Sequence, residues 1–408
     1  MTGEVTDPQD RPEHGHDAEL GPAEMVQVLH QLPAIWLRAN CPCAACLDRG
    51  TGERLVSITD IPREVAVRSV RRSGGRLEVV FGPDGHRSSF DPQWLSEFAA
   101  SSMTASRPGA TGPPAALLAG RQGPSDDYRA EDAKRLWSAA EIAAAFPQGS
   151  WPLFVADPAH REACLTAVLR DGFVVLADVP RKAGQVLAVA QRMGVARPTE
   201  YGGIVNVHIG ATQLSGAFTW LAVPPCTAGP FRDQLLTVKL LCCIEDANQG
   251  GASILVDGFK AAAELRAADP DAFAVLASTP VTFAHADAVT QMRSTSPVIG
   301  TDPHGRIREI RFASAFLQPL RLPPDQLVRF YGAYRAFAEL VSSPALTVAF
   351  RLRPGDCLVI DNTRVLNGRT AFTESSPRRM QASWADLDGL ASQLAIMRHH
   401  KSNGKVRH

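Results

Sequence analysis

Apolar residues recur with two different periods in the C-terminal two-thirds of the chain. A repeat of three to four residues predicts amphipathic helices, and short runs rich in β-branched residues predict strands. The helices are expected at 138–145, 160–171, 182–193 and 324–342. The strands are expected at 173–176, 236–244, 252–256, 281–284, 307–312, 347–352 and 357–360. Because strands and helices do not alternate as βαβ units, the pattern predicts an α+β domain built on antiparallel sheets.

The N-terminal part of the chain has a different pattern. Short β-type runs at 55–58, 65–70 and 77–81 are separated by Gly and Pro, which predicts a small β-rich module. Polar segments without apolar periodicity surround it and predict tails and a linker. The expected organisation is a disordered tail 1–22, a module 23–99, a linker 100–130, a larger domain 131–398 and a tail 399–408.

Composition and charge exclude several classes of function. The 408 residues carry 42 basic and 42 acidic side chains, which argues against an electrostatic nucleic-acid binder. The richest apolar run, Leu235 to Ile244, is interrupted by Lys239 and is too short to span a membrane. No apolar signal segment follows Met1, so we expect a cytoplasmic protein in which disulfides do not form.

Three of the eight cysteines fall within six residues, which indicates a metal site. Cys41, Cys43 and Cys46 leave a tetrahedral zinc ion one ligand short, and His86, in a turn after a predicted strand, is the expected fourth ligand. Such a closed site would be structural, and Cys43→Ser is expected to lose the zinc and the fold of the module. The alternative is three buried thiols beside a surface histidine.

The run PAIWLRANCPCAACLD, followed by FGPDGHRSSFDPQWL, resembles the N-terminal domain of the gamma-butyrobetaine hydroxylase family. The resemblance continues through DGFVVLADVP, AQRMGVARPTEYGG, LLCCIEDANQGGASILVDGF, FRLRPGDCLVIDNTRVLNGRTAF and RRMQASWADLDGL. It implies a double-stranded β-helix (jelly-roll) domain of the taurine dioxygenase superfamily behind the zinc module, commonly as a homodimer. Members of the family are iron(II)- and 2-oxoglutarate-dependent oxygenases.

The residues that should hold iron differ from the family pattern. The family's H-x-D element matches Cys226-Thr227-Ala228, and its distal histidine matches Asn367 in VLNGR. A thiol and a neutral amide are poor donors for iron, so we expect neither catalytic iron nor 2-oxoglutarate. His285-Ala286-Asp287 also spells H-x-D, but it matches no ligand segment of the family and is interpreted as a strand-end histidine and a loop aspartate.

Acid or base chemistry is therefore assigned to His208, Cys226 and Asp233. His208 is either catalytic or a hydrogen-bonded part of the pocket wall. Cys226 is either a nucleophile, if a neighbouring cation or histidine lowers its pKa, or a small apolar residue filling space.

By the same resemblance, the substrate site is expected to comprise Tyr201, Phe218, Trp384, Asn367 and Arg378. The three rings would form an apolar wall, although each is equally compatible with the core. Arg378 matches the arginine that binds the far carboxylate of 2-oxoglutarate, and the alternative is an ion pair with Glu374.

These observations lead to one main hypothesis and two alternatives. The main hypothesis is an iron-independent enzyme of specialised metabolism that carries out a non-redox step, such as an elimination, isomerisation, cyclisation or hydrolysis, on a carboxylate-bearing small molecule. The first alternative is an iron- and 2-oxoglutarate-dependent oxygenase with an atypical metal site. The second is a non-catalytic binding or assembly homologue. In every case we expect structural zinc and no nucleic-acid or membrane partner.

Overall fold

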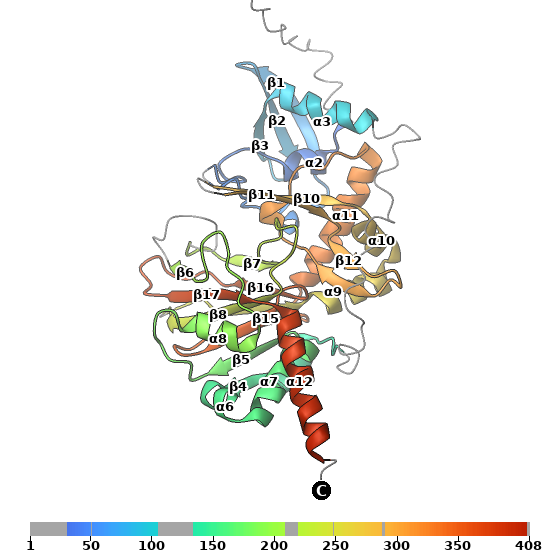
Figure 1. Cartoon of the computed structure of the whole chain (residues 1–408). Coiled ribbons are helices and arrows are strands. Elements are labelled where there is room, and N and C mark those ends of the chain that lie inside the picture. Colours follow the sequence, from blue (N-terminus) through green and yellow to red (C-terminus); the bar gives the residue numbers. More distant parts are fainter. Residues whose placement is uncertain are drawn as a thin grey trace, which may run out of the picture.

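The computed structural model describes residues 31–49, 51–104, 134–208, 219–247, 249–287 and 290–405 (Figure 1). The predicted tail 1–22 lies outside this part, as does the predicted linker from residue 105 onward. Helix α3 (Pro92–Thr104) runs through the first residues of that linker, and α12 (Leu387–Lys405) runs through most of the expected C-terminal tail. In the described part, no helix is long and apolar enough to cross a membrane.

The N-terminal module is a three-stranded antiparallel sheet with a helix at each end of its sequence (Figure 1). Its elements are α2 (Ala34–Ala39), β1 (Ala66–Ser73), β2 (Arg76–Gly82), β3 (Arg87–Phe90) and α3. Gly74 and Gly75 form the β1–β2 turn with positive φ angles of 57° and 74°. A two-residue hairpin turn needs such angles if its twist is to match the right-handed twist of the two strands. Alternation along β2 directs Leu77, Val79 and Phe81 inward.

Two further sheets form the jelly roll. In the described residues the larger one has six strands in the order β4-β5-β15-β8-β17-β6, and the smaller has four in the order β14-β9-β16-β7. The larger sheet comprises β4 (Gln148–Ser150), β5 (Phe173–Ala177), β15 (Cys357–Asp361), β8 (Val238–Glu245), β17 (Arg379–Ala385) and β6 (Val205–His208). The smaller comprises β14 (Thr347–Phe350), β9 (Ser253–Asp257), β16 (Val365–Arg369) and β7 (Val223–Cys226).

The central strand β8 is buried on both faces, which explains its nearly continuous apolar sequence. Leu241 and Cys243 join the core between the two sheets, whereas Leu240 and Cys242 join a second core on the outer face. Helices cover that outer face (Figure 1), namely α6 (Trp151–Ala156), α7 (Pro158–Asp171), α8 (Gln185–Met193) and α12.

A second group of helices and hairpins joins the jelly roll to the N-terminal module. It comprises α9 (Gly258–Ala268), α10 (Pro270–Ser278), β10 (Val281–Ala286), β11 (Gln291–Ser296), β12 (Ile299–Thr301), β13 (Ile307–Ile310), η4 (Ser314–Phe316) and α11 (Pro324–Val341). Buried side chains of the module, including Trp36, share one hydrophobic cluster with Phe330 and Tyr334 of α11. The module and the larger domain therefore share one hydrophobic cluster, although a linker was predicted between them in the sequence.

The α+β class and the jelly roll are confirmed. The predicted strands of the large sheet and the four predicted helices are present, including the short α5 (Ala139–Ala144). The run 55–58 is not a strand, because the chain turns there into the 3₁₀ helix η1 (Ile58–Asp60). Helices α2, α3, α6, α9, α10 and α12 were not expected, and of these α6 and α9 begin directly after strands β4 and β9.

The expectation that no disulfide forms differs from the structure, which joins Cys242 and Cys357. The two residues face each other directly across β8 and β15, and both are buried in the outer core. The sequence places Cys242, Cys243 and Cys357 in apolar strands, and only the pairing of β8 with β15 brings Cys242 opposite Cys357.

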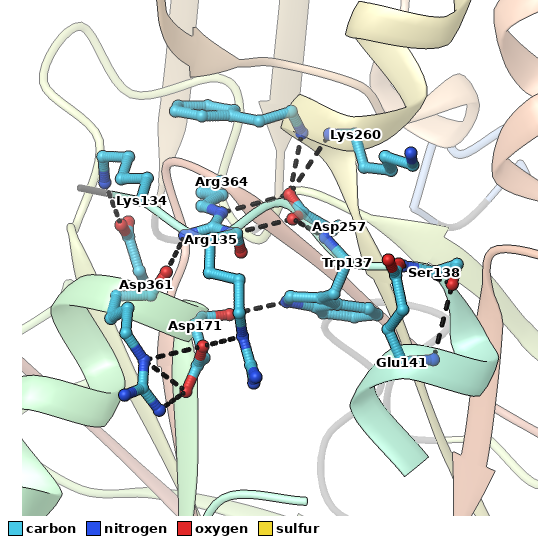
Figure 2. A network of polar contacts seen from close by, with 12 residues as sticks. Lys134, Arg135, Trp137, Ser138, Glu141, Asp171, Asp257, Lys260, Asp361 and Arg364 are labelled. Carbon is cyan, nitrogen blue, oxygen red and sulfur yellow. Dashed lines mark hydrogen bonds and ion pairs between the residues drawn. The ribbon is translucent and has the colours of Figure 1, made fainter. Parts of the chain in front are cut away.

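A buried polar network fixes the turn between β15 and β16 (Figure 2). Arg364 donates to both carboxylate oxygens of Asp257, and both side chains are completely buried. Asp257 also caps the first turn of α9, where it accepts from the backbone nitrogens of Phe259 and Lys260. A second aspartate of this network, Asp171, pairs with Arg135 at 2.8 Å. These bonds connect the loop before β16 to the segment that precedes α5, at the start of the larger domain.

Candidate functional site: a zinc knuckle and a cationic cavity

The four predicted zinc ligands lie together. The Sγ atoms of Cys41, Cys43 and Cys46 lie 3.2, 3.7 and 3.6 Å from Nε2 of His86. All four donor atoms lie within 4.8 Å of one another. A tetrahedral zinc ion with ordinary bond lengths would separate its sulfur and nitrogen ligands by about 3.5 Å. The donor set and its geometry therefore fit zinc.

Polar groups around this cluster support the thiolates that zinc would bind. The Ser88 hydroxyl lies 2.8 Å from the Cys41 sulfur, and the Arg38 guanidinium donates to the Cys46 sulfur at 3.3 Å. Such outer contacts orient ligands and stabilise their negative charge. In the described residues, this is the only group of three or more His, Cys, Asp or Glu side chains able to hold a metal ion.

A cavity of about 540 Å³ opens between the two sheets of the jelly roll and the N-terminal module. Strands β7, β8, β16 and β17 supply one part of its wall, and the loop 48–57 of the module supplies another. Among the residues predicted for the site, Tyr201, Cys226, Asn367, Arg378 and Trp384 line this cavity. Its volume suits a small organic molecule.

The tripeptide Cys226-Thr227-Ala228 is held firmly in the cavity wall. Thr227 donates its hydroxyl hydrogen to the carbonyl of Ile310 at 2.7 Å, and the Ala228 backbone exchanges hydrogen bonds with the Asn362 amide. Cys226 faces Asn367 directly across β7 and β16. A Cβ atom at Gly368 would lie 2.5 Å from the carbonyl oxygen of Val223, so glycine permits this close approach.

The resemblance assigns the metal donors to this place, but the side chains here do not fit iron. They are the thiol of Cys226, the methyl group of Ala228 and the amide of Asn367. Iron in oxygenases of this kind is held by two imidazoles and a carboxylate. In addition, the Asn367 oxygen already accepts a hydrogen bond from Nζ of Lys239, at 2.9 Å.

Three cationic side chains meet at this end of the cavity. They are Lys239 of β8, Arg369 of β16 and Arg378 just before β17. Burial lowers the pKa of Lys239, and Arg369 and Arg378 lower it further, while the Cys226 thiol acts in the opposite direction. Burial, with Arg378 beside it, lowers the pKa of Arg369 to about 10.

Arg378 does not pair with Glu374. The Arg378 side chain is buried beside the ring of Phe372 and lines the cavity, whereas Glu374 is exposed. Within the described residues, no carboxylate lies at ion-pair distance from its guanidinium group. This arrangement leaves Arg378 able to bind an anionic ligand.

Another polar cluster lies on the cavity wall around Tyr201. The Tyr201 hydroxyl donates to the Asp287 carboxylate at 2.7 Å and lies 3.1 Å from Nε2 of His285. The His285 Nε2 and Asp287 Oδ2 atoms are 3.4 Å apart. The imidazole is buried and stacks on Phe231, with ring centroids 4.9 Å apart. Burial and the contact with Asp287 raise the pKa of Tyr201.

Two of the predicted site residues that the structure describes are not brought to the cavity wall. Asp233 is exposed, and only its backbone carbonyl is engaged, by Arg311. His208 ends the edge strand β6 opposite Arg379 and does not line the cavity. Phe218 lies outside the described residues. The roles of His208 and Asp233 as acid or base remain untested predictions, and neither position favours contact with a ligand in this cavity.

Lys239, Arg369 and the Tyr201–His285–Asp287 cluster were not expected at this site from the sequence. Lys239 did carry a signal, because it is the one charged residue within an apolar run. The His-x-Asp spacing of His285 and Asp287 was also visible. Neither feature of the sequence shows which residues of other strands these side chains contact in the fold.

Comparison with known proteins identifies relatives over almost the whole chain. Residues 139–384 match the model of the taurine catabolism dioxygenase TauD, TfdA family, and residues 26–96 match the gamma-butyrobetaine hydroxylase-like N-terminal model. A gamma-butyrobetaine dioxygenase from Pseudomonas sp. (strain AK-1) is 31% identical over 365 residues, with 89% of each chain covered. The human gamma-butyrobetaine dioxygenase is 27% identical, with 91% of this chain and 92% of the human protein covered.

A trimethyllysine dioxygenase from Meyerozyma guilliermondii is 25% identical, with 89% of each chain covered. All three relatives are thus named as dioxygenases of small molecules. These names contradict the main hypothesis from the sequence, an iron-independent enzyme with a non-redox reaction, which is therefore wrong. They favour the first alternative, an oxygenase. The expectation that catalytic iron and 2-oxoglutarate are absent is not confirmed.

Proposed function

Because this chain belongs to the taurine catabolism dioxygenase TauD, TfdA family, we propose that it is an oxygenase of a small molecule with an atypical metal site. The observation that carries the proposal is the cluster of Tyr201, His285 and Asp287 on the cavity wall. Tyr201 and His285 line the cavity that the family fold provides, and the Asp287 carboxylate contacts both of them.

The geometry of this cluster fits an octahedral cation. Its three donor atoms are 2.7, 3.1 and 3.4 Å apart. Three ligands on one face of an octahedral ion with bonds of about 2.1 Å are separated by about 3 Å. The imidazole and the carboxylate suit iron(II), and the Tyr201 phenol, whose pKa is raised in the metal-free site, would lose its proton to bind as the third donor. The donor set at Cys226, Ala228 and Asn367 does not, so we place no metal there.

The chain itself holds this cluster in position. Phe231 fixes the plane of the His285 ring by stacking, and Phe316 contacts the ring with its edge. The backbone nitrogen of Thr290 donates to the other oxygen of Asp287 at 2.7 Å, which orients the carboxylate. Iron(II) bound here with a 2-oxo acid would supply the activation of dioxygen.

The substrate class follows from the rest of the wall. Arg378 provides a guanidinium group for a carboxylate, and Trp384, Val223 and Leu241 provide apolar surface. We therefore propose a carboxylate-bearing small molecule with an apolar part.

Metal binding tests this proposal directly. The zinc-containing protein is titrated with iron(II) without oxygen, and bound iron is measured by elemental analysis after gel filtration. We expect one iron per chain in the wild type and none in His285→Ala or Asp287→Asn. His208→Ala and Asp233→Asn are matched controls outside the cavity and should retain the iron.

Turnover is the second measurement. A wild type that binds iron should release succinate from 2-oxoglutarate when a carboxylate-bearing substrate is present. If no iron binds beyond the zinc site, or if His285→Ala binds it normally, the proposed site is excluded. If the wild-type protein neither binds iron nor turns over a substrate, the result would instead support the second alternative, a non-catalytic binding homologue.

A further inference from the structure

Lys239, Arg369 and Arg378 line one end of the cavity, and Asp246, which follows β8 and pairs with Arg351, acts on Arg378 only electrostatically. The cavity-lining residues of β7, β8, β16 and β17 include no Asp or Glu in the described chain. The acidic residues of the cavity wall, Asp48, Glu53 and Glu200, come from the N-terminal loop and the segment before β6 instead, and Glu200 pairs with Arg232.

Lys239 has unused hydrogen-bonding capacity at this end. An ammonium group has three donors, yet in the described residues Asn367 Oδ1 is the only acceptor for Nζ. The ring of Trp384 lies beside it, with the nitrogen 6.0 Å from the ring centroid. Burying a cation with one neutral acceptor and two cationic neighbours is unfavourable unless an anion joins it.

The position of Lys239 suggests what this anion is. The residues that the resemblance matches to the metal donors are Cys226 and Asn367, and Lys239 is bonded to one and interacts electrostatically with the other. The ammonium group therefore brings positive charge to the place where relatives are expected to hold their metal ion. Arg378, the matched carboxylate anchor, remains nearby on the same wall.

We propose that Lys239 and Arg378 form a binding site for a small dicarboxylate or 2-oxo acid that needs no metal ion. Lys239 binds one carboxylate through its free N–H groups, and Arg378 binds the other, so this ligand competes for Arg378 with the carboxylate-bearing substrate proposed above. Arg369 adds positive charge, while its guanidinium group remains bonded to the carbonyl of Leu221. This inference goes beyond the proposed oxygenase function, because the site operates whether or not iron binds at Tyr201, His285 and Asp287.

Calorimetric titration with succinate and 2-oxoglutarate tests the site, using protein that contains zinc and no iron by elemental analysis. We expect binding of both, and no binding of succinamide, the neutral diamide of succinate. Lys239→Met keeps the length and apolar stem of the side chain and removes its charge, so affinity should fall by about 10- to 100-fold. Lys239→Arg should recover most of that loss.

Lys260→Met is the matched control, because Lys260 pairs with Glu264 on α9 and does not line the cavity. Its affinity should equal that of the wild type. Thermal unfolding of each variant without ligand verifies folding, and the stabilisation of folded protein by succinate gives a second readout. Equal affinity in Lys239→Met, equal binding of succinamide, or binding that appears only after iron is added would each overturn the proposal. Failure of iron binding at His285 leaves this result unaffected, so the two proposals are tested separately.

Discussion

At the scale of single residues, the environment of Cys226 decides between the two interpretations of its thiol. Burial raises the pKa of Cys226 to about 11, although Lys239 acts to lower it. The thiol therefore stays protonated at neutral pH and is a weak nucleophile. A small side chain that contacts Asn367 and fills the wall agrees better with this environment than a catalytic nucleophile does.

Arg378→Gln provides a residue-scale prediction. The substitution removes a guanidinium group that lines the cavity without a carboxylate partner in the described chain, so the affinity for succinate should fall by about 1.5–3 kcal/mol. Calorimetry measures this loss. The adjacent Arg379 is exposed, and Arg379→Gln is the matched control that should leave the affinity unchanged. An unchanged affinity in Arg378→Gln would remove Arg378 from the site.

At the scale of elements, one buried ion pair connects strands of the smaller sheet with the helix that follows. Asp257 is the last residue of β9 and the N-terminal cap of α9, while Arg364 immediately precedes β16. Arg364 also donates to the carbonyl of Arg170 near the end of α7. The pair therefore fixes where β16 begins, and with it the position of Asn367 in the cavity.

Asp257→Asn is expected to lower the free energy of unfolding by about 3–5 kcal/mol. Asparagine still caps a helix, but it leaves the buried Arg364 guanidinium without its counter-charge. Asp269 caps α10 on the exposed surface, so Asp269→Asn removes the same charge from a similar cap and should cost less than about 1 kcal/mol. Denaturant unfolding measures both, and equal losses would contradict the role of the buried pair.

At the scale of the whole molecule, the zinc module is part of the cavity. Cys46, one of the four residues that could bind zinc, is followed at once by the loop 48–57, which lines the cavity. Within this loop, Leu55 is bonded back to the Cys46 carbonyl at 2.9 Å, and Arg54 is bonded to Ala315 of the larger domain at 3.0 Å. Loss of the metal would therefore disturb both the module and the ligand site.

Cys43→Ser should remove about one zinc per chain and destabilise the module by more than about 2 kcal/mol, because metal binding contributes directly to folding. Affinity for succinate should fall as well, since the loop 48–57 loses its support. Elemental analysis, denaturant unfolding and calorimetry measure these effects. Cys164→Ala, at a free cysteine in the outer core, should keep its zinc. A fully folded, zinc-free wild type would contradict a structural role for the metal.

Much of this protein is readable from its sequence because the relevant signals are local. The spacing of Cys41, Cys43 and Cys46 indicates the zinc site, and apolar runs such as 236–244 indicate the strands of the large sheet. Long motifs also indicate the family and the jelly roll. Helices α9 and α12 were missed because each begins within two residues of the end of a strand, with little more than Asp257 or Asp386 to mark the change.

The functional interpretation needed the tertiary structure, since it depends on which side chains face each other across strands. Lys239 and Asn367 are 128 residues apart in sequence, and Tyr201 and His285 are 84 apart. Sequence determines the kind of chemical group at each position, because that is a property of one residue. Only folding decides that an ammonium group meets the Asn367 amide in a carboxylate-free end of the cavity, because burial and strand register are properties of the whole chain.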